Sequence, residues 1–224
     1  MEQPVIKMEI KMRNNKLVLS LLIVVFGWLS CFASYAQSGA TQSDPIAMLQ
    51  YMANNMIAGL KANKATLKTK PQVVYQLANR YVVPYASLTA MAKSVLPPNI
   101  WNNATPAQRM QFQKEFTTTL IRTYASALTS YEDQTVHFYP IRGGYAGANT
   151  VEVNSEITGS NSQPINVSYR LVRAGSVWRL FDLSVEGVSM LESFRSQFAD
   201  ILESGTMDQL LQRMSEHNSG EGRS

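Results

Sequence analysis

The chain has 224 residues, of which 45% are hydrophobic and 16% charged. This composition excludes a disordered protein, and the length suits one domain with a sizeable core or two small domains. The net charge of +4 falls to +2 without residues 1–36, which hold four of the 20 basic and two of the 16 acidic residues. A charge balance this close to zero argues against a nucleic-acid-binding protein, which normally has a strongly basic face.

Residues 1–36 have the pattern of a secretory signal peptide. An apolar run, 17–29, is followed by small residues at Ser34 and Ala36, the positions that a signal peptidase reads. The run is shorter than the about 20 residues of a membrane-spanning helix, so a retained anchor is the weaker alternative. The basic residues that precede the run are Lys7, Lys11, Arg13 and Lys16.

We predict cleavage after Ala36, which leaves residues 37–216 as the folded domain and 217–224 as a disordered polar tail. Cys31 is the only cysteine, and a lipid-modified cysteine is a weaker alternative because Trp28 stands where such signals normally have leucine. After the predicted cleavage no cysteine remains. Packing, not disulfides, must then stabilise the domain.

The first half of the domain has the periodicity of helices. Ser43 or Asp44 caps a first helix that has Pro45 at its start and ends in the lysine-rich segment 61–70. We interpret that segment as a solvated connection, with a patch for anionic lipid or an acidic partner as the alternative. Two short helices follow, separated at Pro84, and "PPNIW" predicts a turn.

A long helix begins with the capping box of Thr105 and Gln108, with Pro106 at its first position. Its apolar stripe recurs every four residues and continues beyond the middle of the helix. The stripe faces either a filled core or a ligand cavity. Its members are Phe112, Phe116, Leu120, Tyr124 and Leu128, with Ala127 and Tyr131 beside them.

From Gln134 the apolar period changes to two, which predicts antiparallel strands around 151–157, 165–171 and 177–187. Alternation places Trp178, Leu180 and Asp182 on one strand face. A helix with Phe194 and Phe198 on its apolar side follows, and a capping box from Thr206 to Gln209 starts a last short helix. Helices, strands and helices in this order predict an α+β fold in which helices cover one face of a curved sheet.

The sequence has few groups suited to catalysis. His137 and His217 have no partner at metal-ligand spacing, and "GGYAG" lacks the context of a phosphate-binding loop, so we expect neither a metal nor a cofactor. Asp182 is the exception, since a carboxylate in apolar surroundings can act as a base. A backbone-capping role for Asp182 is the commoner alternative.

Three segments resemble the MlaC family, the periplasmic phospholipid-binding proteins of the toluene-tolerance family. They are "YVVPYASLTAMAKSVL", "WNNATPAQRMQFQKEFTTTLIRTYASALTSY" and "WRLFDLSVEGVSMLESFRSQFADIL". The resemblance covers about residues 44–214. Tyr85 stands where the family often has an acidic residue, a departure that affects no lipid-binding feature.

The resemblance implies a nuclear-transport-factor-like sheet and a helical part that hold phospholipid tails between them, with the headgroup outside. It also implies a monomeric periplasmic shuttle that maintains outer-membrane lipid asymmetry. The implied partners are an inner-membrane ABC transporter complex, met through its ring-shaped substrate-binding subunit, and an outer-membrane lipoprotein bound to a porin. Phospholipid is the expected cargo.

Apolar residues in both parts of the domain are the expected cavity lining. A carrier has to enclose about 30 methylenes, which would cost about 25 kcal/mol in water at about 0.8 kcal/mol each. The predicted lipid-binding residues are Val74, Leu77, Tyr81, Met91, Phe112, Phe116, Leu120, Tyr124, Val153, Val167, Tyr169, Trp178, Leu180, Phe194 and Phe198.

Two other classes of function are compatible with the pattern. Sheets of this shape also occur in isomerases and dehydratases, for which Asp182 with Tyr169 or Tyr124 is the candidate group. A chaperone-like module that binds partners through an exposed apolar face is the other alternative.

Overall fold

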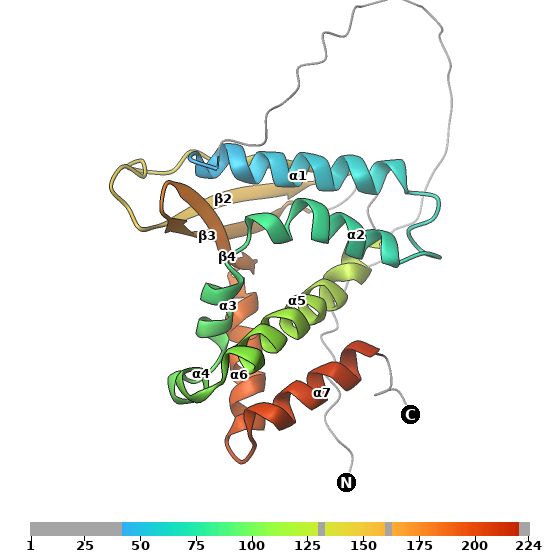
Figure 1. Cartoon of the computed structure of the whole chain (residues 1–224). Coiled ribbons are helices and arrows are strands. Elements are labelled where there is room, and N and C mark those ends of the chain that lie inside the picture. Colours follow the sequence, from blue (N-terminus) through green and yellow to red (C-terminus); the bar gives the residue numbers. More distant parts are fainter. Residues whose placement is uncertain (1–41, 130–132, 160–162, 220–224) are drawn as a thin grey trace, which may run out of the picture. The chain divides into compact units, whose positions relative to one another are not determined.

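The structure, a computed structural model, describes residues 42–129, 133–159 and 163–219 (Figure 1). These residues belong to one of two units into which the chain divides, Gln37–Ser224; the other is Met1–Ala36. The predicted signal peptide, Cys31 and Tyr131 therefore lie outside the described residues.

The first part of the fold consists of short helices separated by prolines. They are α1 (Pro45–Ala62), α2 (Gln72–Tyr81), the 3-10 turn η1 (Val83–Tyr85), α3 (Leu88–Val95) and α4 (Pro98–Asn103). Asp44 caps α1 as predicted, since its carboxylate accepts hydrogen bonds from the N–H groups of Ile46 and Ala47. The predicted turn at "PPNIW" is wrong: it forms α4, because Pro98 occupies a first helical position where its missing N–H costs nothing.

The long helix α5 (Pro106–Thr129) starts at the predicted capping box. The Thr105 N–H donates to the Gln108 side chain at 2.9 Å, and the Gln108 N–H donates to the Thr105 hydroxyl at 3.2 Å. Arg109 connects the first turn of α5 to α4. Its guanidinium carbon lies 5.1 Å from the centroid of the Trp101 ring, and its Nε donates a hydrogen bond to the Trp101 carbonyl. The direction of α5 relative to α4 is thus fixed by several contacts.

The sheet is open, antiparallel and in chain order, β1-β2-β3-β4-β5. Its strands are β1 (Thr135–Phe138), β2 (Thr150–Thr158), β3 (Ile165–Ala174), β4 (Val177–Val185) and β5 (Val188–Ser189). The turn between β4 and β5 contains Glu186 and Gly187, both with positive φ, 49° and 80°. Such a left-handed pair matches the twist of a two-residue hairpin, so "VEGVS" is a tight reversal of the chain.

The chain ends with α6 (Met190–Leu202) and α7 (Met207–Ser219), and α7 packs along α5. The predicted tail boundary is wrong, because His217, Asn218 and Ser219 are still helical. Asn218 holds this last turn in place: its amide donates to the Glu115 carbonyl at 3.0 Å, and its oxygen accepts from the Thr119 hydroxyl at 3.1 Å. Together these elements confirm the predicted α+β class with an antiparallel sheet.

Candidate functional site

The predicted lipid-binding residues do not form one group in the structure. Most of them are distributed over three apolar clusters, which we call the helical, sheet and α2 clusters. The helical cluster includes Met91, Phe112, Phe116, Leu120, Tyr124, Phe194 and Phe198. The sheet cluster includes Val153, Tyr169, Trp178 and Leu180, and the α2 cluster includes Val74 and Leu77. Val167 and Tyr81 belong to none of the three.

In the helical cluster, aromatic rings from α5 and α6 contact one another. Phe116 stacks on Phe112 at 5.5 Å between centroids and meets Phe194 and Phe198 edge-on at 5.3 and 5.7 Å. Phe116 is 2% exposed and Phe112 is completely buried. Rings at these distances and angles stabilise one another directly. The contacts favour the packed-core alternative for these four phenylalanines over the cavity wall.

One face of the sheet carries a continuous apolar row from β2 across β3 to β4. The strand register places Val153 opposite Tyr169 and Val151 opposite Leu171, with Leu180 beyond Leu171. This half of the face is filled by α1 (blue in Figure 1), whose Met48, Leu49 and Met52 belong to the same cluster as these strand residues.

The other half of the same face is packed differently. The register puts Ile157 opposite Ile165, and Val167 between Ser155 and Val185. Leu183 lies opposite Tyr169 on the same face. Ile157, Ile165, Leu183 and Val185 are only half-buried, and Val167 at their centre is 4% exposed. We call these five residues the outer sheet face.

A β-bulge lies beside the boundary between the two halves. Leu171 pairs with Leu180 but Arg170 pairs with Asp182, so Phe181 is an extra residue of β4. The prediction that Trp178, Leu180 and Asp182 share one strand face is therefore wrong, because the extra residue reverses the alternation. Phe181 and Asp182 point to the side of Arg170, whose guanidinium lies 5.0 Å from the Phe181 ring.

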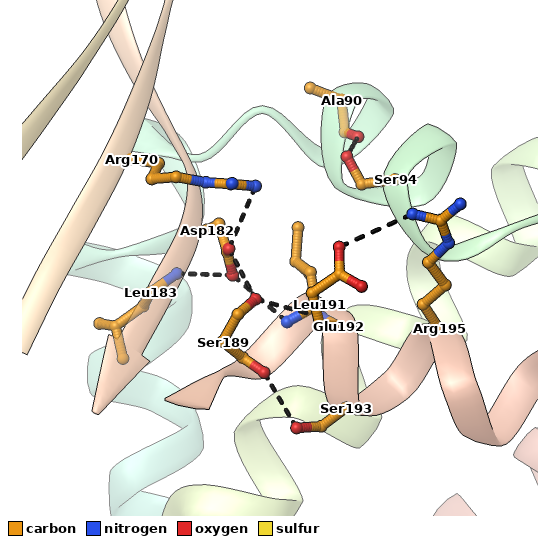
Figure 2. A network of polar contacts seen from close by, with 10 residues as sticks. All are labelled: Ala90, Ser94, Arg170, Asp182, Leu183, Ser189, Leu191, Glu192, Ser193 and Arg195. Atoms are coloured by element: carbon orange, nitrogen blue, oxygen red, sulfur yellow. Dashed lines mark hydrogen bonds and ion pairs between the residues drawn. The ribbon is translucent and has the colours of Figure 1, made fainter. Parts of the chain in front are cut away.

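Asp182 is 2% exposed and its carboxylate is occupied by hydrogen-bond donors (Figure 2). Oδ1 accepts from the N–H groups of Leu183 at 2.8 Å and Leu191 at 3.2 Å. Oδ2 accepts from the Ser189 hydroxyl at 2.7 Å and lies 3.3 Å from Nη2 of Arg170. Because Leu191 lies in the first turn of α6, the carboxylate joins β4 to the start of that helix.

Two half-buried tyrosines lie near these groups. Burial raises the pKa of Tyr124 on α5 above 10.0, and the charge of Asp182 raises it further. Burial also raises the pKa of Tyr169, and the Ser155 hydroxyl, which donates to the phenolic oxygen at 3.2 Å, opposes that shift. Both side chains are neutral at pH 7 and present apolar rings.

The hairpin loop between β1 and β2 borders an open hollow of about 960 Å³. Its lining includes Arg142, Glu152 and Asn154, and none of the predicted lipid-binding residues, all of which are described, contributes to it. Within the described residues there is no group of three or more potential metal ligands. No helix among them is both long and apolar enough to cross a membrane.

An open antiparallel sheet with helices on its apolar face is also the architecture of a solved phospholipid-binding protein. The structure matches that of the phospholipid-binding protein from Ralstonia solanacearum in complex with a phospholipid, with a TM-score of 0.72 and 30% identity. The match covers 79% of this chain and 98% of the other. The chain therefore shares the α+β fold of that phospholipid-binding protein.

Comparison of sequences gives the family. The profile of the family described as MlaC protein matches residues 50–216, so the chain belongs to the MlaC family. It is 28% identical to toluene tolerance protein ttg2D of Pseudomonas putida, over 79% of this chain and 81% of that one. It is 24% identical to the intermembrane phospholipid transport system binding protein MlaC of Haemophilus influenzae, over 80% and 84%. The predicted family resemblance is confirmed.

Sequence reasoning missed most of the outer sheet face. Of its five members only Val167 was among the predicted lipid-binding residues. Ile157 and Ile165 continue the alternation of Val153 and Val167, so the strand pattern carried the signal for them. Leu183 and Val185 had no such signal, because the bulge at Phe181 interrupts the alternation of β4.

Proposed function

We propose that the protein binds a phospholipid and holds its acyl chains against the outer sheet face. The observation that carries this proposal is the difference in burial along one apolar face: Val153 and Leu171, in the half filled by α1, are completely buried, whereas Ile157, Ile165, Leu183 and Val185 in the other half are only half-buried. The phospholipid in the similar Ralstonia solanacearum structure supports the chemical class of the ligand.

The lining that we propose combines strand and helix residues. Val167 and Tyr169 come from the predicted set, and Ile157, Ile165 and Leu183 extend it along the strands. On the helical side we propose Tyr124, Leu77 and Tyr81, which are only partly buried. The four phenylalanines of the helical cluster then support the wall from behind instead of forming it.

The energetic argument requires such a lining. Two acyl chains left in water would cost about 25 kcal/mol, whereas a face of branched aliphatic side chains offers them an apolar environment at no cost in hydrogen bonds. The headgroup stays charged and needs water, so it remains at the mouth of the site.

We further propose that the carrier works in the periplasm and moves phospholipid between the inner and outer membranes, which maintains outer-membrane lipid asymmetry. Support comes from the signal-like residues 1–36 and from the name of the Haemophilus influenzae relative, an intermembrane phospholipid transport system binding protein. The proposed partners are an inner-membrane ABC transporter, through its ring-shaped subunit, and an outer-membrane lipoprotein–porin complex.

The geometry of Asp182 disfavours the enzyme alternative. A general base needs a lone pair directed at a substrate proton. Both oxygens of this carboxylate instead accept hydrogen bonds from the protein, and one also contacts Arg170. Asp182 is accounted for as the anchor between β4 and α6, the backbone role that the sequence left open.

The proposal is tested by extracting protein purified from a bacterial envelope with organic solvent and identifying the extract by mass spectrometry. We expect diacyl phospholipid in an amount comparable to that of the protein. Protein that yields none, and that takes up no labelled phospholipid after delipidation, would refute phospholipid binding.

A further inference from the structure

The near-neutral total charge conceals a strongly uneven distribution. Between Asp44 and Glu115 the sequence contains no aspartate or glutamate. Basic residues in the same stretch are Lys61, Lys64, Lys68, Lys70, Arg80, Lys93, Arg109 and Lys114. This stretch of the sequence therefore contributes only positive charge, and clustered positive charge attracts anions over several ångströms.

Lys61, Lys64, Lys68 and Lys70 lie at the connection between α1 and α2, and all four are exposed. The connection is ordered by its own hydrogen bonds. The N–H groups of Thr66 and Leu67 donate to the Asn63 carbonyl at 2.8 and 3.1 Å, and the Lys70 N–H donates to the Thr66 carbonyl at 2.7 Å. We call this segment, residues 61–70, the lysine loop.

Leu67 anchors the lysine loop to the body of the protein. Its side chain is 1% exposed and packs with Leu60 of α1, Val74 of α2 and Ala125 of α5. The lysines on either side of this anchor stay in solvent, because the single apolar residue of the turn occupies the buried position. A cation array held in this way loses little conformational freedom of the backbone when it meets an anionic surface.

The composition of the lysine loop fits a diffuse anionic surface better than a shaped protein partner. Protein interfaces depend on apolar or aromatic anchors in their centre. Among the described residues the large exposed apolar side chains are Met110, Tyr139 and Val188, none of which lies in or next to the loop. A bilayer of anionic lipids needs no such anchor, since the surface potential attracts each lysine that comes near it.

We propose that the lysine loop docks the protein on the headgroups of anionic phospholipids at a bilayer surface. The inference rests on the proposed function to the extent that a phospholipid carrier has to reach a bilayer. Lys64 contributes less than its neighbours, because Asp133 lies 3.5 Å from its ammonium group. Without apolar residues to insert, the contact is reversible and sensitive to salt.

The test is co-sedimentation with vesicles of phosphatidylcholine, with and without phosphatidylglycerol, at low ionic strength. We expect binding only to the anionic vesicles, and its loss when salt shortens the Debye length to about 3 Å. Changing all four lysines, Lys61→Gln, Lys64→Gln, Lys68→Gln and Lys70→Gln, should weaken the binding by more than about tenfold.

A matched control removes the same charge elsewhere: Lys93→Gln, Lys114→Gln, Arg195→Gln and Arg213→Gln, all at exposed positions. This variant should keep most of the binding, and exchange of the four loop lysines for arginine should preserve it. Equal losses in both glutamine variants, or no preference for anionic vesicles, would overturn the proposal. Phospholipid extracted from each purified variant measures cargo binding independently of vesicle binding. A failure of the proposed carrier function can therefore be told apart from a failure of membrane docking by the lysine loop.

Discussion

The two halves of the apolar sheet face have similar sequences and different packing. Val153 and Leu171 are completely buried and pack in one cluster with the methionines and the leucine of α1. Ile157 and Ile165 repeat the same alternation on the same strands but are only half-buried. Alternation in a strand therefore predicts which face is apolar but not whether protein or ligand covers it.

The β-bulge at Phe181 explains why β4 takes part in both the sheet and the helical cluster. Before the bulge, Leu180 packs in the sheet cluster; Phe181 at the bulge packs against the helical one. Beyond it, Leu183 and Val185 return to the outer sheet face. One extra residue thus lets a single strand contribute to the filled core, the anchor of α6 and the proposed site.

The largest effect is expected at the centre of the helical cluster. Phe116→Ala should lower the free energy of unfolding by about 3–5 kcal/mol, because the surrounding rings of Phe112, Phe194 and Phe198 leave a void. Phe116→Trp should also destabilise, by about 1–3 kcal/mol, with unchanged bound phospholipid. A tryptophan variant of normal stability that has lost its lipid would instead make Phe116 a cavity wall.

The anchor between β4 and α6 should come next. Asp182→Asn removes the buried negative charge that faces Arg170, and we expect a loss of about 2–3 kcal/mol in unfolding free energy, since the half-exposed Arg170 can regain water. Phospholipid transfer by the folded variant should stay within a few fold of the wild type. Transfer lower by several orders of magnitude at normal stability would support a catalytic carboxylate.

A matched pair of substitutions compares the two halves directly. Val153→Trp on β2 should destabilise by about 1–3 kcal/mol, because α1 leaves no room for the larger ring. Ile165→Trp on β3 should cost less stability, because Ile165 is only half-buried, and it should reduce the bound phospholipid by taking space that acyl chains occupy. The measurements are the thermal unfolding temperature and the amount of extracted phospholipid for both variants. Equal destabilisation with unchanged phospholipid would show that the outer sheet face is filled by protein.

The smallest effect concerns alkaline pH. Burial raises the pKa of Tyr169 above its ordinary 10.0, so the folded state binds its proton more tightly than the unfolded state does. This contribution to stability is complete below pH 10 and is lost as the pH rises through the higher folded-state pKa. Tyr169→Phe should therefore flatten the loss of stability above pH 10, as measured by denaturant unfolding. An unchanged alkaline slope would show that Tyr169 is ionised as easily in the folded state.

Local signals in the sequence predicted most of the fold. The caps at Asp44 and Thr105, the change of period after Gln134 and the capping box at Thr206 all have their expected geometry. The bulge at Phe181 has no such signal, since it depends on how β4 pairs with β3. The same holds for the site: the apolar residues were recognisable, but only tertiary contacts separate Phe116, surrounded by rings, from Val167.

The most direct test of phospholipid binding at the outer sheet face is photo-crosslinking from two positions on β2. Ile157 and Val151 are both half-buried and lie on the same sheet face, the first in the outer half and the second in the half that packs in the sheet cluster, where it also borders the hollow at the β1–β2 loop. With a benzophenone amino acid at either position, we expect irradiation of the lipid-loaded protein to add one phospholipid mass at position 157 and none at position 151. Adducts at position 151 alone, or at neither position in protein shown to contain phospholipid, would contradict the proposed location of the acyl chains.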